Sequence, residues 1–335
     1  MIVSYLGDTN FIYENSSKRT NCCSRGEVEM TNLLLSVSDL SQQQLYSIFH
    51  TAKNFKAKIR KRETVDVLRN RVVGLLFEKP STRTRTSFEA ATLRLGGQAI
   101  YLPSSELQLS RGEPIKDTAR ILGGYLDAIV ARVYAHDTVV QLSKHSGIPV
   151  INGLSDLEHP TQIVCDLFTI MEAKEKIEGL TLAFIGDGNN MCNSLLLGAA
   201  ITGMNMTAAC PNGYHPKKEI FEKAKGIAEK TGAELKIVQN PKDAAENADI
   251  LYTDVWVSMG QDKEREERMK AFQGYQISSE LLKLAAEDAV VMHCLPAHRG
   301  LEITDDVIEG KQSIVWTQGE NKLHGAAAIL DFLLK

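Results

Sequence analysis

The sequence predicts an α/β protein of two doubly wound domains, each with a central parallel sheet flanked by helices, and with long helices joining the two domains. Short apolar runs alternate with amphipathic stretches, the pattern of βαβ units. The chain has 335 residues, 43% hydrophobic and 24% charged, a length that suits two domains with separate cores. A longer helical stretch, "SDLEHPTQIVCDLFTIMEAKEKIEG", lies between two groups of apolar runs.

We predict domain boundaries from changes in these patterns. Residues 1–30 show no clear period and are expected to be a flexible extension, or the product of an upstream start codon. Residues 31–152 form the first predicted domain and residues 153–318 the second. The final helix, residues 319–335, is expected to pack back on the first domain.

The first element is a helix that begins at Ser41, where Ser41 and Gln44 form a capping box ahead of apolar residues at helical spacing. Strands and helices then alternate. The expected strands are, in chain order, "RVVGLLFE", "QAIYL", "AIVARVY", "IPVIN", "LTLAFIGD", "MTAACP", "ELKIVQ", "DILYTDVW", "AVVMHCLP" and "SIVWTQ". The first four precede the predicted boundary near residue 152.

Composition excludes several classes of protein. The 38 basic and 42 acidic residues give a net charge of -4, so there is no broad positive field for nucleic acid or anionic lipid. Six cysteines show no CxxC pair, and the N-terminus lacks the features of a secretion signal. No run of 18 apolar residues occurs. We therefore predict a cytoplasmic protein with small-molecule partners, and with neither nucleic acid nor membrane as a partner.

The stretch "EKPSTRTRTSFE" places many hydrogen-bond donors directly after a predicted strand. Pro80 suits the first turn of a helix, and Ser81, Thr82, Arg83 and Thr84 lie where that turn leaves backbone N–H groups free. Free amides, hydroxyl groups and a guanidinium together bind a phosphate or carboxylate. The alternative is a capped surface helix with solvated arginines. The spacing is not that of a P-loop.

Other polar residues close later strands or open later helices. Arg132 ends the apolar run "AIVARV", where a charged side chain usually has a buried partner. His159 precedes a helix that begins at Pro160, so His159 and Gln162 can face one ligand, unless His159 is an ordinary helix-start histidine. Asp254 closes "DILYTD" and suits an ammonium group, unless it only caps a loop.

Two further patterns argue against a dinucleotide-binding site and against a cysteine–histidine catalytic dyad. In "GDGNN" the third glycine of a dinucleotide-binding fingerprint would fall at Met191, so the amides Asn189 and Asn190 are better candidates for a ligand contact. In "VVMHCLPAHRG" the adjacent residues His293 and Cys294 point to opposite faces of a strand, so a cysteine–histidine dyad is not expected. Zinc binding lacks a supporting ligand spacing. We predict no metal and no organic cofactor.

Taken in order, these motifs resemble those of the aspartate and ornithine carbamoyltransferase family. The matching segments are "STRTRTSFE", "YLDAIVARVY", "HPTQ", "GDGNN", "DVWVSMG" and "HCLPAHRG". The resemblance covers roughly residues 33–335. It implies transfer of a carbamoyl group from carbamoyl phosphate to the δ-amine of L-ornithine, giving L-citrulline and phosphate, in arginine metabolism. The alternatives are a carbamoyltransferase for putrescine or a modified ornithine, and a non-catalytic protein that binds carbamoyl phosphate or an amino acid.

The resemblance also implies which residues contact each substrate. The expected carbamoyl-phosphate contacts are Ser81, Thr82, Arg83, Thr84, Gln108, Arg132, His159, Gln162, Cys294, Leu295 and Lys322. The expected ornithine contacts are Asn190, Asp254, Ser258 and Met259. The expected catalytic residues are Arg132, His159, Asp254 and Cys294. The first domain would bind carbamoyl phosphate and the second ornithine.

Three details refine this expectation. The "SMG" and "HCLP" segments resemble those of ornithine enzymes rather than aspartate enzymes. Gln108 matches a glutamine that family members lend to a neighbouring subunit, which implies a homotrimer with shared active sites and allows larger assemblies of trimers. Lys322, in "QGENKLHG", stands where the family has arginine. Lysine keeps the charge but loses the bidentate fork, so weaker binding of carbamoyl phosphate or a shifted local geometry is expected.

Overall fold

The computed structural model describes residues 33–258 and 262–335, and the statements below concern those residues. The predicted extension 1–30 and the predicted ornithine contact Met259 lie outside the described residues. Within them, no helix is long and apolar enough to cross a membrane.

The first half of the described chain forms a parallel five-stranded sheet with the strand order β1-β5-β4-β2-β3. The bounds are β1 Leu33–Leu34, β2 Val72–Phe77, β3 Gln98–Pro103, β4 Ala128–Arg132 and β5 Val150–Leu154. In the register of β2 and β4, Phe77 pairs with Arg132, so both strands end at the same edge of the sheet. The segment "KPSTRTR" therefore starts beside Arg132.

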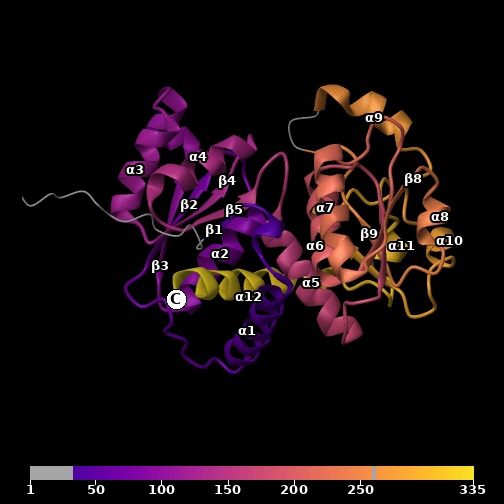
Figure 1. The fold of residues 1–335 in the computed structure, drawn as a ribbon, viewed down its shortest axis with the longest axis horizontal. Helices are drawn as coiled ribbons and strands as arrows, with labels where there is room; N and C mark the ends of the chain where they lie inside the picture. The colour runs from indigo at the N-terminus through magenta and orange to yellow at the C-terminus, as the bar shows by residue number, and fades with distance from the viewer. Residues whose placement is uncertain (1–32, 259–261) are drawn as a thin grey trace, which may run out of the picture. The chain divides into compact units, whose positions relative to one another are not determined.

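The second half forms another parallel five-stranded sheet, with the order β10-β9-β6-β7-β8 (Figure 1). The bounds are β6 Thr181–Ile185, β7 Asn205–Ala209, β8 Leu235–Val238, β9 Ile250–Thr253 and β10 Val290–His293. Both sheets are parallel and helices follow most strands, which confirms the predicted α/β class.

Helices cover both faces of each sheet. Their bounds are α1 Gln42–Arg60, α2 Thr82–Arg94, α3 Ile115–Tyr125, α4 His136–Ser146, α5 Pro160–Lys174, α6 Asn190–Thr202, α7 Lys218–Thr231, α8 Pro241–Ala245, α9 Arg265–Ala271, α10 Ser279–Leu282, α11 Asp305–Ile308 and α12 Val315–Leu334. Four short 3₁₀ helices complete the fold: η1 Val37–Asp39, η2 Ser104–Glu106, η3 Gln108–Arg111 and η4 Asp262–Glu264.

The alternation of side chains along the strands divides the interior into three apolar clusters. On β4, Val130 belongs to the largest cluster and Ile129 to a smaller one that includes residues of α3 and α4. On β6, Phe184 belongs to the largest cluster and Ile185 to the cluster that includes residues of α8, α10 and α11. The largest cluster thus runs along one face of both sheets.

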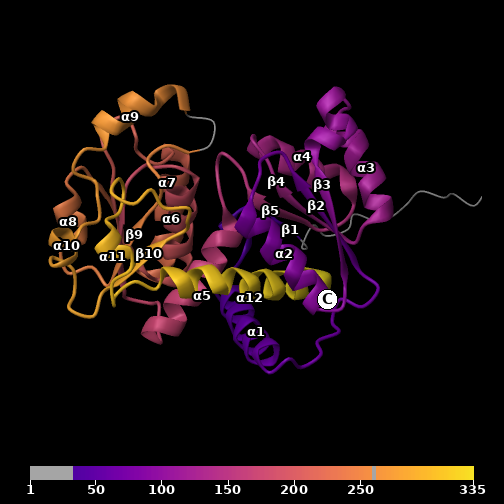
Figure 2. The same cartoon turned by 180° about the vertical axis from the view of Figure 1, so that it is seen from behind.

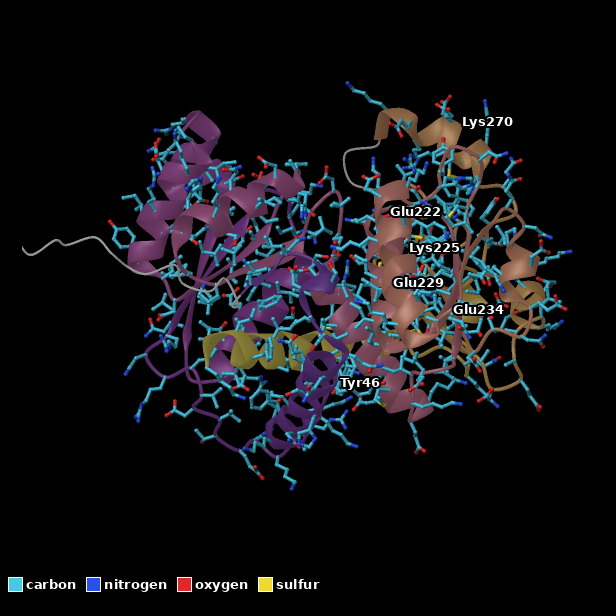
Figure 3. All side chains as sticks on the ribbon, viewed as in Figure 1. Tyr46, Glu222, Lys225, Glu229, Glu234 and Lys270 are labelled. Carbon is cyan, nitrogen blue, oxygen red and sulfur yellow. The ribbon has the colours of Figure 1, made fainter. Side chains whose placement is uncertain are left out.

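Helix α7 illustrates why these sequences fold as surface helices. Its buried residues Ile220, Ala224 and Ala228 recur every four positions. Glu222 and Lys225 are exposed and form an ion pair at 3.8 Å. Both residues are labelled in Figure 3. Burial of the apolar stripe therefore fixes which side of α7 faces the sheet.

Helix α12 returns from the second sheet to pack against α1, α2 and α5, as both views show (Figures 1 and 2). A buried polar network holds it there. The Lys56 ammonium on α1 donates to Glu172 on α5 at 2.6 Å and to Asn321 on α12 at 2.7 Å. Asn321 in turn donates to Thr169 at 3.0 Å. Three helices that are distant in sequence are thereby fixed in one register.

The prediction of a strand for "SIVWTQ" was wrong. Ser313 makes only an isolated bridge to Val291, and α12 begins at Val315. The buried residues Val315, Gln318 and Lys322 follow a helical spacing, but two of them are polar. The helical period was therefore invisible to a reading based on apolar residues, whereas the short apolar run remained compatible with a strand.

Candidate active site

A cavity of about 580 Å³ lies where the strands of both sheets end. Its walls include residues that follow β2, β9 and β10, the last residues of β4 and β5 (Arg132 and Leu154), and Asn190 at the start of the helix after β6. Helices α5 and α12 close it with His159, Gln162 and Lys322. In parallel α/β sheets this carboxyl edge is the place where ligands bind.

The start of α2 forms one wall of the cavity, as the sequence predicted for a donor cluster. Ser81, Thr82, Arg83 and Thr84 all line it. Ser81 is the N-cap and accepts a hydrogen bond from the Thr84 backbone N–H at 3.2 Å. Burial is the main cause that lowers the pKa of the Arg83 guanidinium. The wall therefore offers backbone amides, hydroxyl groups and a partly desolvated cation to an anion.

Arg132 is the most desolvated arginine of the cavity. Its side chain is 7% exposed, and its Nε has no hydrogen-bond partner within the described chain. Burial, and then the positive charge of Arg83, lower the pKa of Arg132 to about 10. A buried donor without a partner is uncommon and costly. Arg132 is thus a preformed donor for an oxygen atom that enters the cavity.

His159 is the N-cap residue of α5, with Pro160 in the first turn. Its backbone N–H donates to Ser194 at 2.9 Å, which ties this end of α5 to α6. Burial, followed by the charges of Lys322 and Arg132, lowers the pKa of the imidazole well below its usual value. His159 is therefore neutral at neutral pH and can donate one N–H to a ligand without carrying a charge.

Gln162 is held on both sides by charged groups. The Lys322 ammonium donates to Gln162 Oε1, and Gln162 Nε2 donates to Asp166 Oδ1 at 2.8 Å. Asp166 is buried and also accepts from the Tyr252 hydroxyl at 2.7 Å. Burial raises the pKa of Asp166 to about 6 and lowers that of Lys322. These bonds fix the orientation of the Gln162 amide at the cavity wall.

Asp254 forms the centre of the opposite wall, where its carboxylate has several donors. Oδ1 accepts from the Val255 backbone N–H at 2.8 Å and from the Cys294 thiol at 3.0 Å. Oδ2 accepts from the Asn189 amide at 2.8 Å. Burial, and then the negative charge of Asp254, raise the pKa of the Cys294 thiol well above its ordinary value. Cys294 is thus a thiol donor rather than a thiolate nucleophile.

The His293 imidazole is bonded to partners outside this pair. Its Nδ1 accepts from the Leu295 backbone N–H at 2.8 Å, which leaves Nε2 to donate to buried Glu302 at 3.2 Å. Asp254, His293 and Cys294 do bring one possible metal-ligand atom each within 4.8 Å of one another. A metal bound there would have to displace one of the two partners of the imidazole.

The remaining predicted contacts fall in different places. Asn190, Ser258 and Leu295 line the cavity, and Asn190 also donates to the Ser155 carbonyl at 2.7 Å. Gln108 does not line it: this residue is exposed at the start of η3. Met259 lies outside the described residues.

Sequence reasoning did not assign several residues that shape the site. Lys79, Arg265 and His298 line the cavity. Lys79 directly precedes the donor cluster, so its position in the chain could have indicated it. Asn189, which the sequence offered as a ligand contact, does not line the cavity; it caps α6 and donates to Asp254 instead. His298 lies in the segment "HCLPAHRG", which was the available signal for it, whereas no motif in the sequence connects Arg265 with the cavity.

Comparison with known proteins covers nearly all of the described chain. A family model described as the carbamoyl-P binding domain of aspartate/ornithine carbamoyltransferase matches residues 32–172, and one described as the Asp/Orn binding domain matches residues 178–333.

The individual relatives that this chain resembles are ornithine carbamoyltransferases. The ornithine carbamoyltransferase of Archaeoglobus fulgidus is 54% identical over 301 residues, covering 90% of this chain and 97% of the relative. That of Methanosarcina acetivorans is 51% identical over 302 residues, covering 90% and 99%. Among solved structures, ornithine carbamoyltransferase from Pyrococcus furiosus is 45% identical, with a TM-score of 0.87, and the match covers 90% of this chain and 96% of that one.

Proposed function

Because this chain belongs to the aspartate/ornithine carbamoyltransferase family, we propose that it transfers the carbamoyl group of carbamoyl phosphate to the δ-amine of L-ornithine, giving L-citrulline and phosphate. One observation carries the proposal. A single cavity brings a wall of cationic and hydroxyl donors opposite the hydrogen-bonded pair of Asp254 and Cys294. The first wall suits an acyl phosphate and the second suits an amine.

Carbamoyl phosphate binds first in this proposal, in the part formed by residues 31–152. Its phosphate lies at the start of α2, where the hydroxyl groups of Ser81 and Thr82 and the Arg83 guanidinium donate to it. The buried cations support this assignment, because a dianion offsets the cost of their desolvation. The leaving group is already activated, so the proposed reaction needs no metal and no organic cofactor.

The carbamoyl carbonyl oxygen receives hydrogen bonds from Thr84, Arg132 and neutral His159 in this scheme. The unpartnered Nε of Arg132 supports this role. As the amine attacks, negative charge grows on that oxygen, and donors already in place stabilise it without reorganisation. The carbamoyl NH₂ group faces Gln162, whose amide is held between Lys322 and Asp166.

Ornithine binds in the part formed by residues 153–318, through Asn190, Asp254, Ser258 and Met259. Its δ-amine lies near Cys294 and the Leu295 carbonyl. A free amine of this type titrates near ~10.4, so the ammonium must lose a proton before it attacks. Desolvation in the closed cavity favours the neutral amine. The new C–N bond replaces the C–O bond to phosphate, which leaves with a proton.

The experiment that tests this proposal is citrulline formation by the purified protein with carbamoyl phosphate. L-Ornithine, putrescine, L-aspartate and N-acetylornithine are compared at matched concentrations over a pH series. We expect turnover selective for ornithine that rises as the pH approaches the pKa of the amine. Preference for another amine would overturn the assigned specificity, and absence of turnover with all four would favour a binding protein.

We also propose a cytoplasmic homotrimer in which Gln108 reaches the phosphate site of a neighbouring subunit. The position of Gln108, exposed and outside its own cavity, supports this arrangement. Mixing inactive Gln108→Ala and Arg132→Ala subunits would create some sites that carry neither change. Recovery of citrulline formation in the mixture is expected, and no recovery would contradict shared sites.

A further inference from the structure

The charges on the cavity walls are unequal. Within the described residues, the lining side chains include one carboxylate, Asp254, and five cations: Lys79, Arg83, Arg132, Arg265 and Lys322. Four of the cations lie on or close to the wall assigned to carbamoyl phosphate. Arg265 instead comes from α9, on the side of the cavity that also includes Val255 and Ser258. This wall therefore has one cation that the proposed reaction does not yet use.

The position of Arg265 is fixed by its own helix. Arg268 lies three residues later on the same face of α9. It is buried and donates to Asp187 at 2.8 Å and to the Trp256 carbonyl at 3.1 Å. Its guanidinium also stacks on the Tyr214 ring, 4.9 Å from the centroid. This anchor turns the face with Arg265 toward the cavity.

A second observation agrees with that orientation. Arg265 and Met269 line a small second cavity together with Trp256 and His298, so this face of α9 looks inward along more than one turn. The Arg265 side chain is exposed, and among residues 33–258 and 263–335 it has no hydrogen-bond or ion-pair partner. A guanidinium that lines the cavity and has no partner among these residues is available to a ligand.

Resting on the proposed function, we infer that Arg265 is a specificity-determining residue that binds the α-carboxylate of the amino-acid substrate. Ornithine carries two ammonium groups and one carboxylate. Asp254 suits an ammonium group, whereas a carboxylate is best recognised by the planar fork of an arginine. An arginine here distinguishes an amino acid from a diamine of the same length, since putrescine has no carboxylate.

The test uses two ligands that cannot be carbamoylated on a δ-amine. L-Norvaline has the α-carboxylate of ornithine, and L-norvalinamide has a neutral amide in its place. Binding of each to the full chain saturated with carbamoyl phosphate is measured by calorimetry. The variants are Arg265→Gln, Arg265→Lys and the control Lys270→Gln, a loss of positive charge at an exposed position of α9 that is labelled in Figure 3.

We expect Arg265→Gln to weaken norvaline binding about tenfold, the effect of losing one charge-assisted hydrogen bond, and to leave norvalinamide binding unchanged. We expect Arg265→Lys to keep part of the difference in affinity between norvaline and norvalinamide, and Lys270→Gln to keep all of it. The affinity for carbamoyl phosphate stays the same in every variant.

Three results would overturn the inference. Equal weakening of both ligands would mean that α9 has moved, a lower affinity for carbamoyl phosphate alone would assign Arg265 to the phosphate, and no change would leave Arg265 without a role in binding. Failure of the proposed function is separately visible, because a wild-type protein that binds norvaline but forms no citrulline would refute the enzyme and not the carboxylate contact.

Discussion

The two walls of the cavity are built in opposite ways. On the wall assigned to carbamoyl phosphate, Arg83, Arg132 and Lys322 are cations whose pKa values are lowered chiefly by burial. On the other wall, Asp254 already accepts hydrogen bonds from Cys294, Asn189 and its own chain neighbour. The first wall is short of negative charge, whereas on the second wall most of the hydrogen-bonding capacity of the Asp254 carboxylate is already used.

This difference indicates how the site divides its work. In the proposed reaction, a bound dianion relieves the unfavourable burial of several positive charges, so the first wall would attract its ligand strongly and would supply the stabilisation of the transition state. The second wall gains less from any one ligand and instead selects among amines by geometry. We therefore expect changes on the first wall to reduce catalysis most, and changes on the second to alter specificity.

The largest effect is expected from Arg132→Ala. Removing one preorganised donor to a developing oxyanion typically lowers kcat by about 10²–10³-fold. Steady-state kinetics with both substrates would measure this loss. Arg94→Ala, at an exposed position of α2, is the matched control and is expected to behave as wild type. An unchanged kcat in Arg132→Ala would remove Arg132 from the mechanism.

A smaller effect, confined to one substrate, is expected from Asp254→Asn. The variant keeps the shape of the side chain but loses its charge, so we expect kcat/KM for ornithine to fall by about 10²-fold while the affinity for carbamoyl phosphate is retained. Ornithine saturation curves and phosphate-analogue binding separate the two quantities. Loss of both affinities together would mean that the walls do not act independently.

Lys322→Arg tests the first wall by adding hydrogen-bonding capacity instead of removing it. Arginine restores a bidentate fork beside Gln162, so we expect the KM for carbamoyl phosphate to fall about threefold with little change in the KM for ornithine. Lys311→Arg, at an exposed position, controls for the substitution itself. A higher KM for carbamoyl phosphate would show that the buried site is shaped around lysine and does not accept the larger guanidinium.

The smallest expected effect is on how the free energy of unfolding changes with pH. The pKa of His159 is lowered in the folded protein. As the pH drops below ~6.5, the unfolded chain therefore binds a proton at His159 before the folded protein does. This difference lowers the free energy of unfolding as the pH falls. Asp166, with its pKa raised to about 6, acts with the opposite sign because the folded protein binds its proton first.

The two contributions are separated by comparing wild type with His159→Asn, in which Asp166 is unchanged. Urea midpoints measured from pH 7.5 down to pH 5 are expected to fall less steeply in His159→Asn than in wild type. Identical pH profiles would show that His159 does not titrate differently in the folded and unfolded chains.

Much of the fold could be predicted from sequence because it depends on local patterns. Alternating apolar runs gave the α/β class, and the ordered motifs gave the family, and both are confirmed. The donor cluster at Ser81–Thr84 was visible because helix starts have a local signature. The strand assigned to "SIVWTQ" was wrong because α12 buries polar residues, which an apolar pattern does not register.

The parts of the site that were missed depend on contacts between distant residues. The bonds from Asn189 and Cys294 to Asp254 join three segments that follow different strands. The link from Lys322 through Gln162 to Asp166 joins α12 to α5. Arg265 lines the cavity from α9, which Arg268 anchors to Asp187. None of these distances is encoded by spacing along the chain.

The return of α12 to the first sheet has a consequence for biosynthesis. A nascent chain emerges from the ribosome with β1 to β5 long before α12, yet Lys322 and the network with Lys56 belong to the region around that first sheet. Domains commonly begin to fold during translation, from the N-terminal side. The first sheet can thus form early, but the proposed phosphate pocket is completed only after the ribosome has made α12, so a partly translated chain is not expected to consume carbamoyl phosphate.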